Sequence, residues 1–233
     1  MLLGHRGLKR FYPENTLPAF RKALQYGADG VEFDVWLTKD GKLIVMHDRY
    51  FRTNGETFDV KTLKLSEIKR LHPLRAMVTT VDEILREFPE AYFNVDVKDI
   101  DAVDDVLKVA GKLDGVILSS DSPAILRAIR ERDEDVKLGF SIVEWNSLFK
   151  FPVLRRKLGL YSLHVPIDAV DYVGLSALKL LLRWARGMGV KIALWNYQQD
   201  EFKYLPYLVR YCDILISDDV SRASRLLGKR LFR

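Results

Sequence analysis

The chain has 233 residues, 48% hydrophobic and 30% charged, which is the composition of a globular protein with one large core. Its formal charge of +5 is spread along the sequence, which favours anionic small molecules modestly and argues against nucleic acid. The single cysteine, Cys212, excludes an intrachain disulfide framework and a thiolate metal cluster. Apolar runs are too short for a signal peptide or membrane insertion, so we expect a cytoplasmic protein. Composition does not indicate the oligomeric state.

The first fifty residues predict a strand, a helix and a hairpin. The predicted elements are a strand at 2–3, a helix from Thr16 to Gly27, a strand over 31–36, a turn at 40–41 and a returning strand over 43–46. Residues 50–78 lack clear periodicity, apart from a possible short helix near 65–71. We therefore expect an insertion at about 48–78.

From residue 81 onward, helices alternate with strands. Helices are predicted at 81–88, 102–113, 123–132, 148–158, 175–187, 201–211 and 221–227, and strands at 92–97, 116–118, 136–142, 161–165, 190–195 and 214–216. Without the returning strand, eight strands remain, each followed by a helix. This pattern predicts an α/β protein, a (β/α)8 TIM barrel, as a single domain over 1–233. An open doubly wound sheet is less favoured, because polar residues cluster at the C-terminal ends of many strands.

Carboxylates occur at the ends of two predicted strands. Glu32 and Asp34 are two residues apart and face the same side, as do Asp96 and Lys98. Active sites of barrels lie at the C-terminal ends of their strands. Three carboxylates there form an all-oxygen site suited to a hard divalent ion. The alternative is a buried structural ion pair with Lys98.

Two of the four histidines, His5 and His47, each end a short apolar strand and precede a charged residue. Imidazole can both accept and donate a proton near neutral pH. Phosphodiester cleavage needs both steps, one at the nucleophile and one at the leaving alkoxide. Arg6 and Lys98 would offset the charge of the phosphate oxygens.

Several motifs resemble the glycerophosphodiester phosphodiesterase family. They are Gly4-His5-Arg6-Gly7, Pro13-Glu14-Asn15-Thr16, Gly27-Ala28-Asp29-Gly30-Val31-Glu32-Phe33-Asp34-Val35, Thr38-Lys39-Asp40-Gly41 and His47-Asp48. Thinner matches follow in family order at 80–85, at 94–98, at Ser119-Ser120, at Trp195 and at 213–218. Five motifs in order within fifty residues are far more specific than any one of them, and the resemblance spans almost the whole chain.

The resemblance implies a (β/α)8 barrel with a small insertion after the second strand, and hydrolysis of glycerophosphodiesters to glycerol phosphate and an alcohol. By position, His5 and His47 match the acid–base pair, and Glu32, Asp34 and Asp96 match the metal ligands. Arg6 and Lys98 match the phosphate-binding cations, with Asn15 and Trp195 as secondary substrate-binding residues. The family implies one divalent cation, Mg2+ by preference with Ca2+ or Mn2+ as alternatives, and a cyclic phosphodiester intermediate.

Departures from the family pattern leave the substrate's alcohol open. Asp96 stands where the family usually has Glu, which draws the carboxylate back by one methylene. Trp195 suits either a glycerol contact or a plug of the barrel mouth, because bulky side chains fill barrel interiors. His164, which no motif supports, is interpreted as structural.

Three other functions are alternatives to this one. Phospholipase D of the spider-toxin type resembles this family and has Asp at the third metal position, but those enzymes are secreted and disulfide-bonded. Phosphosugar isomerases bind phosphate with glycine-rich loops after the last strands, and 196–200 and 217–221 contain no glycine. A non-catalytic phosphodiester-binding module would be expected to have lost a histidine or a ligand, and all are present.

Overall fold

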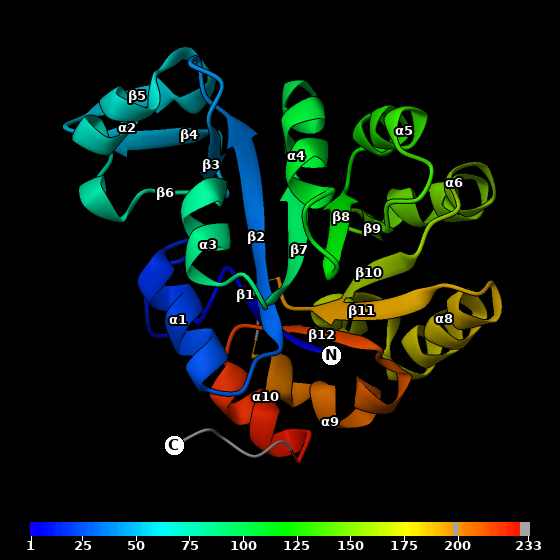
Figure 1. Ribbon diagram of the computed structural model, residues 1–233. Helices are drawn as coiled ribbons and strands as arrows, with labels where there is room; N and C mark the ends of the chain where they lie inside the picture. Colours follow the sequence, from blue (N-terminus) through cyan, green and yellow to red (C-terminus); the bar gives the residue numbers. More distant parts are fainter. Residues whose placement is uncertain (198–199, 229–233) are drawn as a thin grey trace.

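A computed structural model describes residues 1–197 and 200–228; the rest of the predicted domain, 198–199 and 229–233, lies outside the described residues. The fold is the predicted (β/α)8 barrel (Figure 1). In the described chain its parallel strands are β1 (Leu2–His5), β2 (Gly30–Leu37), β7 (Tyr92–Val97), β8 (Val116–Ser120), β9 (Leu138–Ser141), β10 (Ser162–Pro166), β11 (Lys191–Trp195) and β12 (Ile214–Ser217). Because β1 pairs with both β2 and β12, the sheet closes on itself.

Helices cover the outside of the barrel (Figure 1). They are α1 (Leu17–Gln25), α3 (Val81–Glu87), α4 (Val103–Ala110), α5 (Pro123–Arg132), α6 (Phe151–Leu158), α7 (Val170–Val173), α8 (Leu175–Gly187), α9 (Leu205–Leu208) and α10 (Val220–Leu226). Thr16 caps α1 as predicted, since its hydroxyl accepts a hydrogen bond from the Ala19 N–H at 3.4 Å. Between α1 and the sheet, the rings of Phe20, Phe33 and Phe93 pack in sequence and form part of the main apolar core.

Parts of two predicted helices, 148–158 and 201–211, are 3-10 turns. Residues 145–150 form a 3-10 turn before α6, and α9 is flanked by the 3-10 turns Glu201–Lys203 and Val209–Tyr211. Pro152 and Pro206 lie in the first turns of α6 and α9. Proline has no backbone N–H to donate, so an α-helix starts at such a position more readily than it continues through it.

The insertion, which in the structure comprises residues 43–80, follows the C-terminal end of β2 and lies beside the barrel mouth (Figure 1). The strand β3 (Leu43–Val45) pairs antiparallel with β2 and carries β6 (Thr79–Thr80) on its other edge. Between them lie the hairpin β4 (Tyr50–Thr53) and β5 (Glu56–Asp59), which the sequence did not predict, and the expected helix α2 (Leu65–Leu71). The insertion has a small core of its own: Ile44, Phe51, Val60, Ile68 and Val78. That core is a cluster separate from the main core of the barrel.

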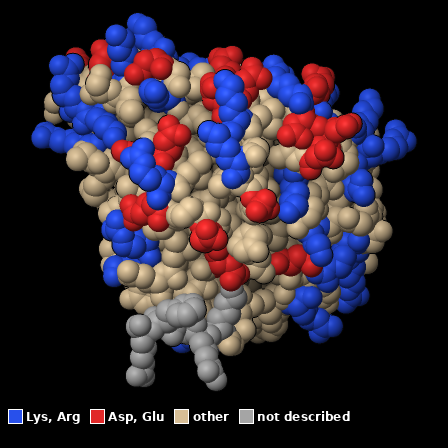
Figure 2. Space-filling model, in the orientation of Figure 1, with Lys and Arg blue, Asp and Glu red and all other residues tan. Residues whose placement is uncertain are grey.

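Acidic side chains lie among basic ones over much of the face in Figure 2, in line with the dispersed charge of the sequence. Within the described chain, none of the helices combines the length and the apolar character needed to cross a lipid bilayer.

A close backbone approach fixes the start of β2, the strand that carries Glu32 and Asp34. A Cβ atom on Gly30 would lie 1.9 Å from the backbone oxygen of Tyr92 on β7. We expect Gly30→Ala to lower the free energy of unfolding by about 2 to 3 kcal/mol, because backbone cannot yield as a side chain does. Urea denaturation measures the change.

The matched control is Gly187→Ala in α8, where an added Cβ meets no atom within 4 Å. This change is expected to leave stability unchanged or to raise it by up to about 1 kcal/mol, since alanine favours helix. Equal stability of the two variants would contradict the account of β2.

Candidate functional site

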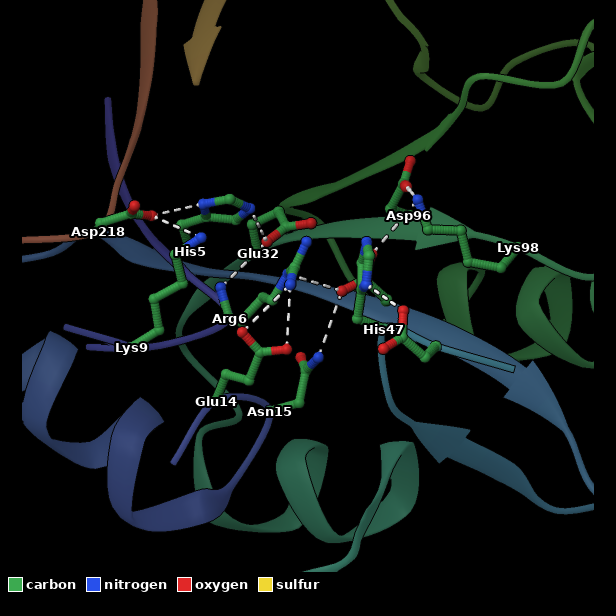
Figure 3. Close-up of polar contacts among 12 residues, drawn as sticks. His5, Arg6, Lys9, Glu14, Asn15, Glu32, His47, Asp96, Lys98 and Asp218 are labelled. Atoms are coloured by element: carbon green, nitrogen blue, oxygen red, sulfur yellow. Dashed lines mark hydrogen bonds and ion pairs between the residues drawn. The ribbon is translucent and has the colours of Figure 1, made fainter. Parts of the chain in front are cut away.

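The barrel mouth holds a cavity of about 220 Å3. Eight of the nine side chains predicted for the site line it: His5, Arg6, Glu32, Asp34, His47, Asp96, Lys98 and Trp195. The ninth, Asn15, lies beside it and donates a hydrogen bond to Asp34 Oδ2 at 3.3 Å. Figure 3 shows His5, Glu32, Asp96 and His47, which come from β1, β2, β7 and the insertion, around this mouth. The structure therefore brings together residues up to 190 positions apart in the sequence, from His5 to Trp195.

His5, the last residue of β1, is buried and held in one orientation. Its Nδ1 lies 2.6 Å from Asp218 Oδ1, and because a carboxylate only accepts, Nδ1–H is the donor. Asp218 is held in turn by Lys9 at 3.1 Å and Asn196 at 2.8 Å. Burial lowers the pKa of His5, although the hydrogen bond to Asp218 opposes the change. Neutral His5 thus directs the lone pair of Nε2 away from Asp218, on the side of Glu32, whose Oε2 is 3.9 Å away.

His47 follows β3, so it reaches the cavity from the insertion and not from the barrel. Its side chain is 37% exposed, and Nδ1 lies 2.8 Å from Asp48 Oδ1. The indole of Trp36 donates to the backbone oxygen of His47 at 3.2 Å and fixes the start of the loop. The two histidines thus differ: one is buried and rigidly paired, and the other is accessible to solvent.

The three carboxylates lie on neighbouring strands, with Asp34 of β2 in register with Asp96 of β7. Burial, together with the charge of Asp34, raises the pKa of Glu32 well above its ordinary value. The ammonium of Lys98 forms an ion pair with Asp96 and lies 3.4 Å from Asp34 Oδ1. Burial would raise the pKa of Asp96, but the charge of Lys98 outweighs it and lowers that pKa. The ion pair considered as an alternative from the sequence is therefore present.

Arg6 adopts a strained backbone conformation, with φ of 50°. Its backbone N–H donates to Glu32 at 3.1 Å, and its guanidinium lies 3.1 Å from Asp34 and donates to both oxygens of Glu14. Asn15 is also left-handed, with φ of 58°, and its N–H donates to the Arg6 carbonyl at 3.0 Å. These contacts keep two strained residues in place against the carboxylates.

Within residues 1–197 and 200–228, no group of three His, Cys, Asp or Glu side chains is arranged to hold a metal ion. The ammonium of Lys98 and the guanidinium of Arg6 lie against the carboxylate oxygens instead. The donor set nevertheless fits a hard cation, because it is all oxygen and its buried negative charge exceeds these two positive charges. Binding a cation would require Lys98 to release Asp96.

Aromatic and polar side chains complete the cavity wall. The Trp195 ring meets His5 edge-on at 6.1 Å and Tyr197 edge-on at 5.7 Å, and its indole nitrogen is buried without a hydrogen-bond partner among the described residues. His164 lies on the wall, bonded to the Ser162 hydroxyl at 2.9 Å. Burial lowers the pKa of His164 to about 4, so it is neutral near pH 7.

Sequence reasoning assigned no role to Asp218 or Glu201. Glu201 Oε1 accepts hydrogen bonds from the Ser217 hydroxyl at 2.6 Å and from the Asp219 N–H at 3.2 Å, the two neighbours of Asp218. Asp218 belongs to a segment that matched the family, but its contact with His5 spans 213 residues. Glu201 lies in a short 3-10 turn with no motif around it. Only the closure of the barrel reveals these roles.

Comparisons with known proteins point to one family. The model of the glycerophosphoryl diester phosphodiesterase family matches residues 5–108. A glycerophosphodiester phosphodiesterase of Caldanaerobacter subterraneus is 52% identical over 73 residues, and one of Bacillus altitudinis is 51% identical over 70. These matches cover 30% of this chain, and 30% and 29% of the length of those two relatives.

Solved structures match over nearly the whole chain. The glycerophosphodiester phosphodiesterase of Thermotoga maritima has a TM-score of 0.82 and is 33% identical, with 97% of each chain covered. A phosphodiesterase of Oleispira antarctica, solved with the product sn-glycerol-3-phosphate, has a TM-score of 0.77 at 20% identity and covers 98% of this chain and 97% of its own. The second likeness shows the fold alone.

The buried carboxyl of Glu201 makes stability depend on pH. Burial raises its pKa to about 7, so its contribution is complete below about pH 4.5 and is lost as pH rises through 7. Glutamine keeps the acceptor oxygen without the charge. Between pH 5 and pH 8, we expect the unfolding free energy of Glu201→Gln to rise by about 2 to 3 kcal/mol relative to the unmodified chain. Denaturant titrations at both pH values measure this, and parallel pH profiles would contradict it.

Proposed function

This chain belongs to the glycerophosphodiester phosphodiesterase family, and we propose that it hydrolyses glycerophosphodiesters to glycerol phosphate and an alcohol. The observation that best supports this proposal is that one cavity holds an oriented, neutral His5 and an accessible His47, together with two cationic side chains and three carboxylates. The product complex of the Oleispira antarctica protein, which shares the fold, supports the glycerol phosphate half of the proposal.

The proposed chemistry starts at the free hydroxyl of glycerol adjacent to the phosphate. His5 Nε2 takes the proton from this hydroxyl as its oxygen bonds to phosphorus. The bond from phosphorus to the alcohol oxygen breaks, and His47 gives that oxygen a proton. Water then attacks the cyclic phosphodiester, with His47 taking its proton and His5 returning one to the ring oxygen that leaves. Both histidines end in their starting protonation states.

The assignment of His5 as the first base rests on Asp218. This carboxylate accepts the Nδ1 proton of His5 and stabilises the imidazolium that forms. Burial raises the pKa of Asp218, but the hydrogen bond from His5 and the charge of Lys9 outweigh it and lower the value to about 2. Asp218 thus stays ionised at working pH. Half-exposed His47 can exchange protons with solvent between turnovers.

Arg6 and Lys98 are proposed to bind the phosphate oxygens, with Asn15 and Trp195 contacting glycerol. Glu32, Asp34 and Asp96 would hold one divalent cation, with Mg2+ preferred and Ca2+ or Mn2+ as alternatives. When bound, such an ion would offset negative charge on the phosphate oxygens. The shorter Asp96 pairs with Lys98, so this ammonium would have to release the carboxylate for a cation to be held there.

Removing either histidine should lower the rate of the chemical step more than it weakens substrate binding. We expect His5→Ala and His47→Ala each to lower kcat by about 10^2- to 10^4-fold, because each removes one proton transfer. Release of glycerol phosphate from glycerophosphocholine measures kcat, and calorimetry with glycerol phosphate checks that binding persists. A His5→Ala variant that binds and turns over unchanged would refute the proton-transfer roles.

Chelation tests the cation. We expect exhaustive treatment with a chelator to lower the rate at least about a hundredfold, and Mg2+, Ca2+ or Mn2+ to restore it, since the phosphate's charge is otherwise less compensated. Circular dichroism before and after chelation controls for unfolding. Full activity in the chelated protein would exclude the ion from the reaction.

Phosphorus NMR of the products separates hydrolysis from a lyase of the phospholipase D type, which would leave a persistent cyclic phosphate.

A further inference from the structure

A second and larger cavity, of about 630 Å3, lies between the insertion and the barrel mouth. His47 lines both this groove and the smaller cavity, so the two spaces meet at that ring. On the barrel side the groove is bordered by Glu14 and Asn15, which contact Arg6 and Asp34. The groove therefore adjoins the candidate active site at His47.

Most of the groove wall is apolar. It includes Met46, Tyr50, Phe51, Leu74, Met77 and Val78. Phe51 belongs to the core of the insertion, packs against Phe58 and meets the ring of His72 edge-on at 4.9 Å. Burial lowers the pKa of His72, so this ring adds a neutral surface near pH 7. The aromatic floor is thus held by the insertion's own packed cluster.

The charged groups at the groove already have partners or lie in solvent. Glu14 accepts two hydrogen bonds from Arg6, at 3.0 and 3.1 Å. Asp48 contacts His47 and is 77% exposed, and Arg52 is exposed. An alcohol carrying a cationic group would compete with Arg6 or His47 for these carboxylates. A hydrocarbon chain that packs on the apolar wall would not compete with Arg6 or His47 for these carboxylates.

We propose that this groove binds an apolar chain on the alcohol half of the substrate, so that the preferred substrates are glycerophosphodiesters of long-chain alcohols. The inference rests on the proposed function, in which His47 protonates the alcohol oxygen and so places the alcohol on its own side of the cavity. A groove of about 630 Å3 falls in the range of sites that enclose large ligands and exceeds what a two-carbon alcohol occupies. The insertion thereby selects the alcohol, while the barrel binds the glycerol phosphate.

Glycerophosphodiesters of ethanol, butanol, hexanol and octanol provide the test. These primary alcohols have closely similar acidity, so differences in kcat/KM report binding of the chain and not the ease of bond cleavage. A fully buried methylene contributes about fourfold in affinity, and a half-open groove contributes less. We expect kcat/KM to rise at least about tenfold from the ethyl to the octyl substrate, assayed below the concentration at which the octyl compound aggregates.

Two matched variants locate the effect. Met77→Glu places a charge on the groove wall, at a side chain 39% exposed, and should abolish the rise with chain length. Leu180→Glu makes the same change at a residue of α8 that is 67% exposed and does not line the groove, and should keep the full rise. Comparing how steeply kcat/KM rises with chain length in each variant removes the effect of any general change in activity. Circular dichroism checks the fold of both variants.

A parallel binding series separates this inference from the proposed function. In glycerol alkylphosphonates the chain is joined to phosphorus through carbon and cannot leave, so their Kd values are independent of turnover. Affinity that rises from ethyl to octyl, and no longer does so in Met77→Glu, supports the groove even if every phosphodiester resists hydrolysis, which would refute the activity alone. Flat series in both kcat/KM and Kd, or an equal rise in Met77→Glu, would overturn the groove assignment.

Discussion

Excess negative charge buried at the barrel mouth is the constraint on which the site depends. Glu32, Asp34 and Asp96 lie on adjacent strands inside a closed sheet, where ionised groups are costly unless compensated. Lys98 and Arg6 supply the compensation. To provide both a backbone N–H and a guanidinium, Arg6 takes up a left-handed conformation. The left-handed Arg6 and the buried ion pair of Lys98 thus act on the same group of carboxylates.

The insertion explains why the two histidines differ. His5 ends a barrel strand, where the neighbouring strand β12 supplies Asp218 to orient it. His47 follows a strand that leaves the barrel, and it sits on the edge of a subdomain with its own core. One histidine is thereby fixed by the main fold and the other by a separately packed element. The insertion also contacts the carboxylate strand, because the Met46 N–H donates to the Asp34 carbonyl at 3.1 Å.

Much of this structure could be predicted from the sequence, and the failures have physical reasons. Buried parallel strands such as β7 are regular because both faces pack, so periodicity and length identify them. The hairpin β4–β5 was missed because its strands are mostly exposed and lack alternation, although Asn54-Gly55 is a turn signal that would have indicated it. Of the nine side chains predicted for the site, eight line one cavity. The motifs did not assign Asp218 or Glu201, whose roles arise only when the last strand closes against the first.

The site also has two parts, one inside the segment that the family model matches and one beyond it. The family model ends at residue 108, so the matched segment supplies both histidines, the three carboxylates and the two cations. Trp195, which lines the cavity, comes from the part of the chain beyond that match, and so do Asp218, which contacts His5, and Asn196, which contacts Asp218. In the proposed function, the groups that contact phosphate therefore all lie in the matched segment. Asp218 acts on the cavity only through His5, at a separation of 213 residues, so no local pattern could assign its role.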